Sequence, residues 1–493
     1  MREKQLRKAE LQVKKYEQYK RLIRFAAGVS LIAIQSIIFM YMWIYCYKDQ
    51  MEMPYQRLGN YALAAVYALI LYVFSSIYGS LRLGYLRNGE LVYAHALATT
   101  CSNAVSYIPI VLLVKHIRSP MPLVWLTVIH FLIIVVWGYS ANTLYRKVYP
   151  PRKVIMVYGE RPMGELMEKI HSRADRFVIS ASVQINRDHM EEVKKMLLKY
   201  EGVVICDLPS VMRNQLLKFC YGHSLRVYTM PKISDIIIRS AEDMHYFDTP
   251  LLLARNDGLS VEQEVIKRAM DILVSAVMLV ITSPIFAVTA LTIKLYDKGP
   301  VFFYQERCTK DGKVFSICKF RSMIVDAEKG GKSIPATDRD PRITPVGAFI
   351  RKVRIDELPQ LLNILKGEMS LVGPRPERVE HVKLYSETIP EFAYRMKVKG
   401  GLTGYAQVYG KYNTTAYDKL KLDLMYIQNY SVLMDIEILF KTIKILFEKE
   451  STEGFSEEAS AMVEQETDSG YEDEYEDDEG GYFYESGDRD KFF

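Results

Sequence analysis

The sequence predicts a membrane protein of mixed α and α/β class, with four N-terminal transmembrane helices and two further folded parts. Three observations predict this class. Uncharged apolar runs fill the first third of the 493-residue chain, a middle stretch alternates short apolar strands with amphipathic helices, and a later apolar run contains a proline. The expected parts are a basic N-terminus (1–24), four transmembrane helices (25–145), an α/β domain (146–259), an α-rich domain (260–450) and an acidic tail (451–493).

Four apolar runs are each long enough to cross roughly 30 Å of hydrocarbon as a helix. They are Phe25–Tyr47, Leu58–Leu81, Leu91–Val114 and Ser119–Tyr145. The first is too long for a signal peptide and lacks a small-residue cleavage site, so we expect it to stay as an anchor. Nine Lys/Arg lie in residues 1–24, and basic residues also follow the fourth run, at 146, 147, 152 and 153. Because basic flanks resist translocation, the N-terminus and everything after the fourth helix should face the cytoplasm.

The formal net charge of +5 hides an uneven distribution. Residues 451–493 hold sixteen Asp/Glu against two Lys/Arg, so the other 450 residues carry +19. A body this basic suits work beside anionic lipid on anionic substrates. The tail has too few aliphatic residues to fold by itself. Its tyrosines are either phosphorylation sites or simply solvated, at Tyr471, Tyr475, Tyr482 and Tyr484.

The α/β domain is predicted to be a degenerate Rossmann-like fold. Its expected strands are KVIMVYG, FVISASVQI, VVICDL and LRVYTM, with helices at Met163–His171 and in the DHMEEVKKMLLKY and PSVMRNQLLKFCYGH segments. The first turn, GERPMG, has glycines only at 159 and 164, so the GxGxxG fingerprint is absent. A regulatory or dimer-forming role is therefore favoured over cofactor binding.

The α-rich domain opens with a run of 22 uncharged residues, Ile272–Ile293, which would be about 33 Å long as a straight helix. Ser283 and Pro284 lie in its middle, where proline removes a backbone hydrogen bond. Basic residues flank both ends, at 267, 268, 294 and 298, which favours the same side of the membrane for both. We expect a re-entrant helix-break-helix at about 266–296; the alternative is a fifth true span.

The candidate reactive residues are two adjacent carboxylates, Asp356 and Glu357, at the start of the segment DELPQLLNILKG. Leu358, Leu361, Leu362 and Leu365 recur at helical spacing, Pro359 fits the first turn, and Gly367 supplies a stop. The two acids could simply complement the helix dipole.

Basic residues near these acids point to phosphoryl chemistry, because guanidinium groups bind phosphate oxygens bidentately and a carboxylate can act as nucleophile or metal ligand. Arg375 is held between Pro374 and Pro376, each with a fixed φ. A structural salt-bridge network is the alternative for any single arginine. The candidates are Lys319, Arg321, Arg351, Arg354 and Arg375.

These strings resemble the bacterial sugar transferase domain of the monotopic polyprenyl-phosphate phosphoglycosyl transferases. The resemblance is close from about 261 to 447, through GPVFFYQER, KVFSICKFRSM, the dyad segment, GPRP and GGLTGYAQVYG, whereas the first 260 residues are similar to the large members of the family in layout only. Such enzymes initiate capsule, exopolysaccharide or O-antigen repeat units at the bacterial inner membrane.

The resemblance implies transfer of a hexose-1-phosphate from a UDP-sugar to undecaprenyl phosphate with release of UMP. It implies that Asp356 is a covalent nucleophile, that Glu357 helps to hold Mg²⁺, with Asp356 beside the metal, and that Lys319, Arg351 and Arg375 bind phosphate. It also places the Pro-Arg-Pro loop at 374–376 and the membrane helix break at Ser283 and Pro284. Membrane lipid is an expected partner, a homodimer the expected assembly, and no nucleic acid is expected.

The sequence departs from the family pattern in three places. KFRTM is KFRSM here, Cys308 and Thr309 stand where many members have Val-Gly, and Gly400 stands where proline is common. The last two put the shape of loops in doubt, though not the dyad. Two other classes stay open: a non-catalytic membrane scaffold of polysaccharide export, and a nucleotide-sugar oxidoreductase or epimerase that would need the missing glycine-rich turn.

Overall fold

The chain separates into two compact units, Met1–Met230 and Pro231–Phe493, in a computed structural model. The structure describes residues 19–51, 57–159, 177–185, 189–246, 248–254, 258–325, 327, 340–410 and 414–446. The helix predicted at 163–171 and the acidic tail therefore lie outside the described residues.

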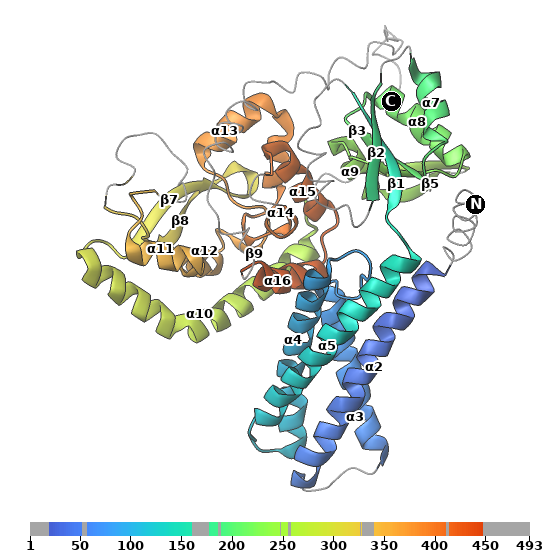
Figure 1. The fold of residues 1–493 in the computed structure, drawn as a ribbon. Coiled ribbons are helices and arrows are strands. Elements are labelled where there is room, and N and C mark those ends of the chain that lie inside the picture. The colour runs from blue at the N-terminus through green and yellow to red at the C-terminus, as the bar shows by residue number, and fades with distance from the viewer. Residues whose placement is uncertain are drawn as a thin grey trace. The chain divides into compact units, whose positions relative to one another are not determined.

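The first unit opens with four long apolar helices, which appear in blue to teal in Figure 1. They are α2 (Lys20–Cys46), α3 (Arg57–Ile77), α4 (Asn88–Val114) and α5 (Met121–Val148), with a short 3₁₀ turn η1 at Lys48–Gln50. Each coincides with one of the four predicted runs. Polar side chains join neighbouring helices: the Tyr67 hydroxyl donates to Asn103 over 2.8 Å, and the Trp43 indole donates to Asn60 over 3.0 Å. Such bonds hold helices together where apolar contact alone gives no preference over lipid.

A four-stranded parallel sheet follows in the same unit, as predicted. The strands are β1 (Arg152–Tyr158), β2 (Phe177–Gln184), β3 (Gly202–Cys206) and β4 (Arg226–Thr229), in the order β2-β1-β3-β4. Val154 and Met156 face one side of β1, and Ile155 and Val157 face the other, so this central strand is buried on both faces. The helices α7 (Met190–Leu197) and α8 (Ser210–Gly222) pack on the face that holds Ile155.

The second unit is rich in helices and contains three small sheets that the sequence did not predict. Antiparallel hairpins are formed by β5 (Glu242–Tyr246) with β6 (Thr249–Leu253) and by β7 (Phe302–Cys308) with β8 (Val314–Phe320), whereas β9 (Ser370–Val372) and β10 (Gly401–Thr403) pair in parallel. The helices are α9 (Ile233–Arg239), α10 (Val261–Asp297), α11 (Pro345–Lys352), α12 (Gln360–Lys366), α13 (Val379–Thr388), α14 (Tyr405–Tyr409), α15 (Ala416–Gln428) and α16 (Val432–Leu446). Short 3₁₀ segments are η3 (Lys310–Gly312), η4 (Ile355–Glu357) and η5 (Pro390–Lys397).

The division between the units lies at Pro231 rather than at the expected boundary near 260. Ile233 and Ile236 of α9 belong to the hydrophobic core of the second unit, where they are joined by Leu420 and Leu424 of α15. The strand and helix pattern does not change after β4, so the sequence did not indicate that α9 packs in the core of the second unit.

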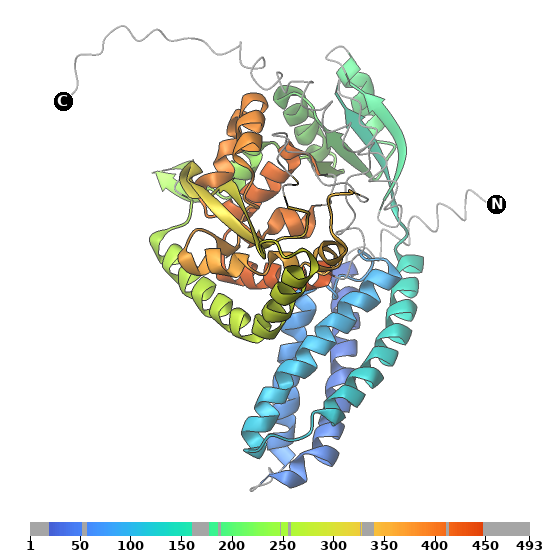
Figure 2. The ribbon, with the colours of Figure 1, turned by 90° about the vertical axis from the view of Figure 1, so that its left-hand side faces the viewer.

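The long helix α10 is continuous from Val261 to Asp297. It begins in a capping box, in which the Gln263 amide N–H donates to the Ser260 hydroxyl over 3.4 Å and the Ser260 N–H donates to Gln263 over 3.0 Å. The expected break at Ser283 and Pro284 is a bend inside the helix, which Figures 1 and 2 both show as an arc. Pro284 has no N–H for the carbonyl of Val280, and the Ser283 hydroxyl donates to that carbonyl instead, over 2.8 Å. Because the lost bond is replaced, the helix bends without ending.

Candidate active site

The two adjacent carboxylates lie on η4, a single 3₁₀ turn between α11 and α12. Arg354, directly before this turn, adopts a left-handed backbone conformation with φ 57° and ψ 19°. The helix α12 begins only at Gln360, and its buried face contains Leu361 and Ile364. The prediction that Leu362 also lies on the buried face is wrong, because this side chain is 38% exposed. Gly367 ends the helix in a left-handed conformation with φ 88°, as predicted.

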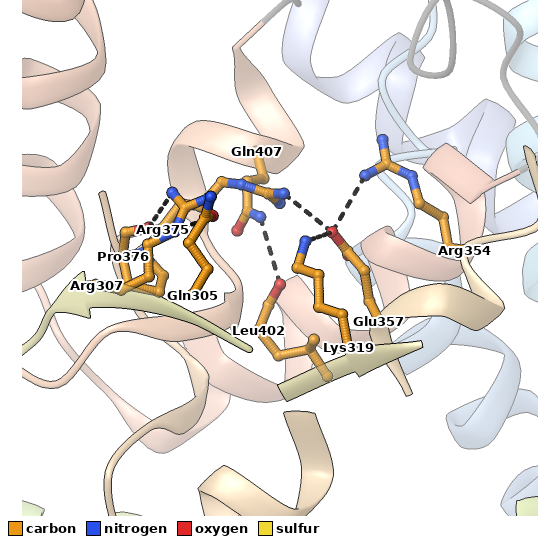
Figure 3. A network of polar contacts seen from close by, with 9 residues as sticks. All are labelled: Gln305, Arg307, Lys319, Arg354, Glu357, Arg375, Pro376, Leu402 and Gln407. Atoms are coloured by element: carbon orange, nitrogen blue, oxygen red, sulfur yellow. Dashed lines mark hydrogen bonds and ion pairs between the residues drawn. The ribbon is translucent and has the colours of Figure 1, made fainter. Parts of the chain in front are cut away.

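Three cationic side chains from separate parts of the chain meet Glu357 (Figure 3). One carboxylate oxygen, Oε1, accepts from the Arg375 guanidinium at 2.9 Å and from the Lys319 Nζ at 3.2 Å, and Arg354 lies 3.8 Å away. Burial opposes the charge on Glu357, but Lys319, Arg375 and Arg354 together hold its pKa well below the usual range. Glu357 is therefore an ionised anchor that keeps the cations in place.

Asp356 has the opposite surroundings. Its Oδ1 atom is buried and has no hydrogen-bond partner among the residues that the structure describes. Burial, followed by the charge of Glu357, raises the pKa of Asp356 to about 6, against the opposing effect of Lys319, Arg351 and Arg354. Two neighbouring carboxylates with pKa values pushed apart are typical of groups that perform different tasks in one reaction.

The structure brings four of the five predicted basic residues to this pair, and it places Arg321 elsewhere. Lys319, Arg354 and Arg375 contact Glu357, and Arg351 on α11 lies close enough to lower the pKa of Asp356. Arg321 instead pairs with Asp297 at the end of α10 and is 7% exposed. Its guanidinium lies over Gly299, where an added Cβ would come within 2.7 Å of it.

The loop at 374–377 is held through its backbone. Four consecutive carbonyls each accept a hydrogen bond from another part of the chain, so the loop is rigid before any ligand arrives. The bonds are Gly401 N to Pro374 O (2.8 Å), Arg395 to Arg375 O (3.0 Å), Arg307 to Pro376 O (3.1 Å) and Cys308 N to Glu377 O (3.0 Å).

Sequence reasoning missed several residues of this network, notably Arg307 and Arg395. Figure 3 shows Arg307 beside the loop, together with Gln305, to which it donates. Arg395 is buried and pairs with Asp423 at 2.7 Å. Burial outweighs that pairing and raises the pKa of Asp423 to about 6. Asp423 carried no distinct signal, because Lys419 and Lys421 precede it in the same helix, and Arg395 stood outside the motifs.

Two departures from the family pattern meet behind the loop. The amide N–H of Gly400 donates to the Thr309 hydroxyl over 3.1 Å, and that hydroxyl donates to the Glu368 carbonyl over 3.0 Å. A Cβ at position 400 would lie 2.9 Å from the Cβ of Pro376, closer than side chains approach. Glycine at 400 thus lets the loop pack closely, and its N–H is used by the threonine.

The described residues contain no group of three His, Cys, Asp or Glu side chains that could hold a metal ion by themselves. Mg²⁺, however, is usually bound by one or two carboxylates together with substrate phosphates and water. The unpaired Oδ1 of Asp356 beside Glu357 fits such a shared site.

Fold and site together define a membrane-associated protein whose helical domain sets a carboxylate pair among cationic side chains. A sequence model described as "Bacterial sugar transferase" matches residues 262–449. An exopolysaccharide production protein of Rhizobium leguminosarum bv. phaseoli is 41% identical over 187 residues, which cover 36% of this chain and 94% of that protein. The chain belongs to the bacterial sugar transferase family, which confirms the resemblance inferred from its motifs.

Two longer relatives carry names that state an activity. The UDP-N-acetylgalactosamine-undecaprenyl-phosphate N-acetylgalactosaminephosphotransferase of Aeromonas hydrophila is 46% identical over 184 residues, 37% of this chain and 43% of that protein. The UDP-glucose:undecaprenyl-phosphate glucose-1-phosphate transferase of Klebsiella pneumoniae is 43% identical over 202 residues, 40% of this chain and 42% of that protein. The match thus spans less than half the length of either relative.

Proposed function

We propose that the protein transfers a hexose-1-phosphate from a UDP-sugar to undecaprenyl phosphate and releases UMP, as the first membrane step of extracellular polysaccharide synthesis. One observation carries this proposal: a buried carboxylate oxygen of Asp356, which has no partner among the described residues, lies beside Glu357, which contacts three cations. The names of the Aeromonas and Klebsiella relatives support the same substrate classes.

The first chemical step is attack of an Asp356 carboxylate oxygen on the β-phosphorus of the UDP-sugar. The bond from this phosphorus to the oxygen that bridges the two phosphates breaks, and UMP leaves with the bonding electron pair. An aspartyl phosphate that carries the sugar remains. In the second step a phosphate oxygen of undecaprenyl phosphate attacks the same phosphorus, and the Asp356 oxygen leaves with its electrons.

The protein's own contribution is charge neutralisation at fixed positions. Phosphoryl transfer needs positioning and electrostatic stabilisation more than strong acid or base chemistry. Arg375 and Lys319 present N–H donors that the diphosphate oxygens can share with Glu357. Mg²⁺, held by Glu357 and Asp356 together with the diphosphate, would supply further neutralisation.

For the membrane, we propose that α2–α5 cross it and that α10 enters and returns on the cytoplasmic side of the bacterial inner membrane. Five helices among the described residues are long and apolar enough to cross, and α10 is one of them. Its apolar side chains point outward, with Leu273 66%, Val280 74% and Leu295 71% exposed. Lys267 and Lys294 lie at its two ends, which favours one side for both. This placement would set the dyad at the headgroups, where the lipid phosphate lies.

A UMP-release assay with the membrane-extracted protein, undecaprenyl phosphate and a panel of UDP-sugars tests the proposal. The expected result is turnover with at least one hexose donor. Without undecaprenyl phosphate, release should stop after a burst of about one UMP per enzyme molecule, because the covalent intermediate cannot be discharged. No release with any donor would leave a non-catalytic scaffold of polysaccharide export.

A further inference from the structure

The first half of α10 carries three charged residues that face the interior of their unit. Asp271 lies four positions after Lys267 and three after Arg268, so both basic residues are its neighbours on one side of the helix. Lys267 and Asp271 are 5% and 2% exposed. Burying charges costs free energy unless each finds partners, so the partners show what these residues hold.

Each of the three residues holds a different element. The Lys267 Nζ lies 2.6 Å from Asp435 of α16, and both groups bond the Tyr426 hydroxyl. Arg268 donates to the carbonyls of Ile364 and Leu365 at 2.6 and 2.7 Å, at the last turn of α12, the helix that follows the dyad.

Asp271 holds β9. Its Oδ1 atom accepts from the Ser370 hydroxyl at 3.0 Å and from the Leu371 amide N–H at 2.9 Å. Ser370 is 1% exposed, so no water competes for these bonds. β9 ends at Val372, and Arg375 follows three residues later on the loop whose carbonyls are all held.

We propose that Asp271 is a positioning residue for the transfer reaction, acting on Arg375 through β9. Asp271 touches neither the dyad nor its cations. It fixes the strand from which the loop starts, and the loop fixes the guanidinium 2.9 Å from Glu357. The inference rests on the proposed function, since its readout is UMP release.

A buried carboxylate on the apolar helix is thus the link between the membrane segment and the reactive groups. A shift of about 1 Å at a positioned group can cost about 100-fold in rate. Asparagine at 271 keeps the size of the side chain and one acceptor oxygen but loses the charge that strengthens both bonds.

A double-mutant cycle tests the proposal, with wild type, Asp271→Asn, Arg375→Ala and the double variant compared for kcat of UMP release and for thermal unfolding. If Asp271 acts through Arg375, Asp271→Asn lowers kcat about tenfold alone but less than about threefold in the Arg375→Ala background, because the group it positions is already gone. The matched control is Glu264→Gln, since Glu264 is also a carboxylate on α10 but pairs with Lys310 at the exposed turn of the β7–β8 hairpin.

The outcomes separate three cases. Equal losses from Asp271→Asn in both backgrounds, or no loss at all, would overturn the inference and leave Asp271 a purely structural residue. A lower unfolding temperature with kcat unchanged in the folded fraction would also overturn it. A wild-type protein that releases no UMP would instead remove the proposed function, and this inference with it.

Discussion

The two carboxylates at 356 and 357 are neighbours in the chain but lie in opposite electrostatic surroundings. Glu357 is bound by cations, whereas one oxygen of Asp356 has no partner in the described part of the chain. An oxygen that must attack phosphorus has to be free of strong hydrogen bonds and ion pairs, whereas Glu357 Oε1 is engaged by Arg375 and Lys319. These contacts support Asp356 as the proposed nucleophile, the residue to which the family resemblance also points.

Asp356→Asn should abolish UMP release, because the amide has nearly the same shape but cannot form the phosphoryl intermediate at a useful rate. The measurement is single-turnover release of UMP, which detects the first step by itself. Asp418→Asn is the matched control, since Asp418 lies on α15 and its contact is a long one with Lys421 at 3.7 Å. Full activity in the Asp356 variant would refute the covalent route.

Arg375→Ala should leave a slow residual rate, lower by about 100- to 1000-fold, because it removes one charged donor to the transition state but not the nucleophile. Arg354→Ala should cost less, about tenfold, since Arg354 is 3.8 Å from Glu357 and its side chain is 34% exposed. Steady-state kcat/KM for both variants checks this order. A larger loss at Arg354 than at Arg375 would contradict the assignment of the loop arginine.

The rate of the first step should depend on pH through Asp356. Only the ionised carboxylate attacks, so kcat/KM should fall as the pH drops below about 6, the value to which burial raises the pKa of Asp356. At high pH a second fall of kcat/KM is expected, because a neutral Lys319 amine cannot bind phosphate. Burial lowers the pKa of Lys319 below its ordinary value, although Glu357 opposes this shift. A profile measured from acid to alkaline pH checks both limbs, and a flat region around pH 6 would contradict the first.

The position of a site residue was predictable where residues adjacent in the chain lie together in the site, as at 356 and 357 or at 374–376. The position of Arg321 was not predictable in this way. Residues 319 and 321 would share a face if the strand continued, but β8 ends at Phe320, so the period of two no longer fixes where Arg321 points. Arg395 was not predicted, because it stands outside the motifs and only the fold brings it to its partners, the Arg375 carbonyl and Asp423.

Among the elements, α10 shows how a proline can be accommodated within a membrane helix. Its sequence predicted an interruption, whereas the structure shows a bend. The hydroxyl of Ser283 donates to the Val280 carbonyl, for which Pro284 has no N–H. Serine at 283 is therefore part of the geometry of the helix. The short strands β9 and β10 escaped prediction for a different reason, since three residues are too few to show any period.

Ser283→Ala should destabilise the protein by about 1–3 kcal/mol, because the Val280 carbonyl would be left without a donor in an apolar setting. In the double variant Ser283→Ala with Pro284→Ala, residue 284 regains an N–H for that carbonyl, so most of the loss should be recovered. Thermal unfolding in detergent measures both. Equal destabilisation of the single and double variants would show that the hydroxyl does not replace the proline's bond.

At the scale of the whole molecule, the side of the membrane on which each part lies decides whether the proposed donor and lipid acceptor can meet. The four N-terminal helices were predictable from length and charge alone, and the described residues contain five helices of the required length and composition. Which of them cross cannot be read from hydropathy, because the same apolar surface suits a helix that returns. The homodimer likewise stays a prediction.

Membrane-impermeant thiol labelling of single introduced cysteines should show Lys153→Cys and Lys313→Cys reacting from the same side. Both positions are exposed, one at the start of β1 and one in the β7–β8 turn. His116→Cys, in the exposed loop between α4 and α5, is the matched control and should react only from the opposite side. Reaction of Lys313→Cys from the side of His116→Cys would make α10 a true span and would rule out a cytoplasmic site.

The bond between Thr309 and Gly400 couples two positions that lie far apart in the sequence. A proline at 400 has no N–H to offer, and a glycine at 309 has no hydroxyl to receive one, so the common family residue at either position alone removes the bond. The two positions are thus expected to be epistatic: once one of them is changed, changing the other costs no further hydrogen bond between them. A scan that substitutes one position at a time would count the same bond twice.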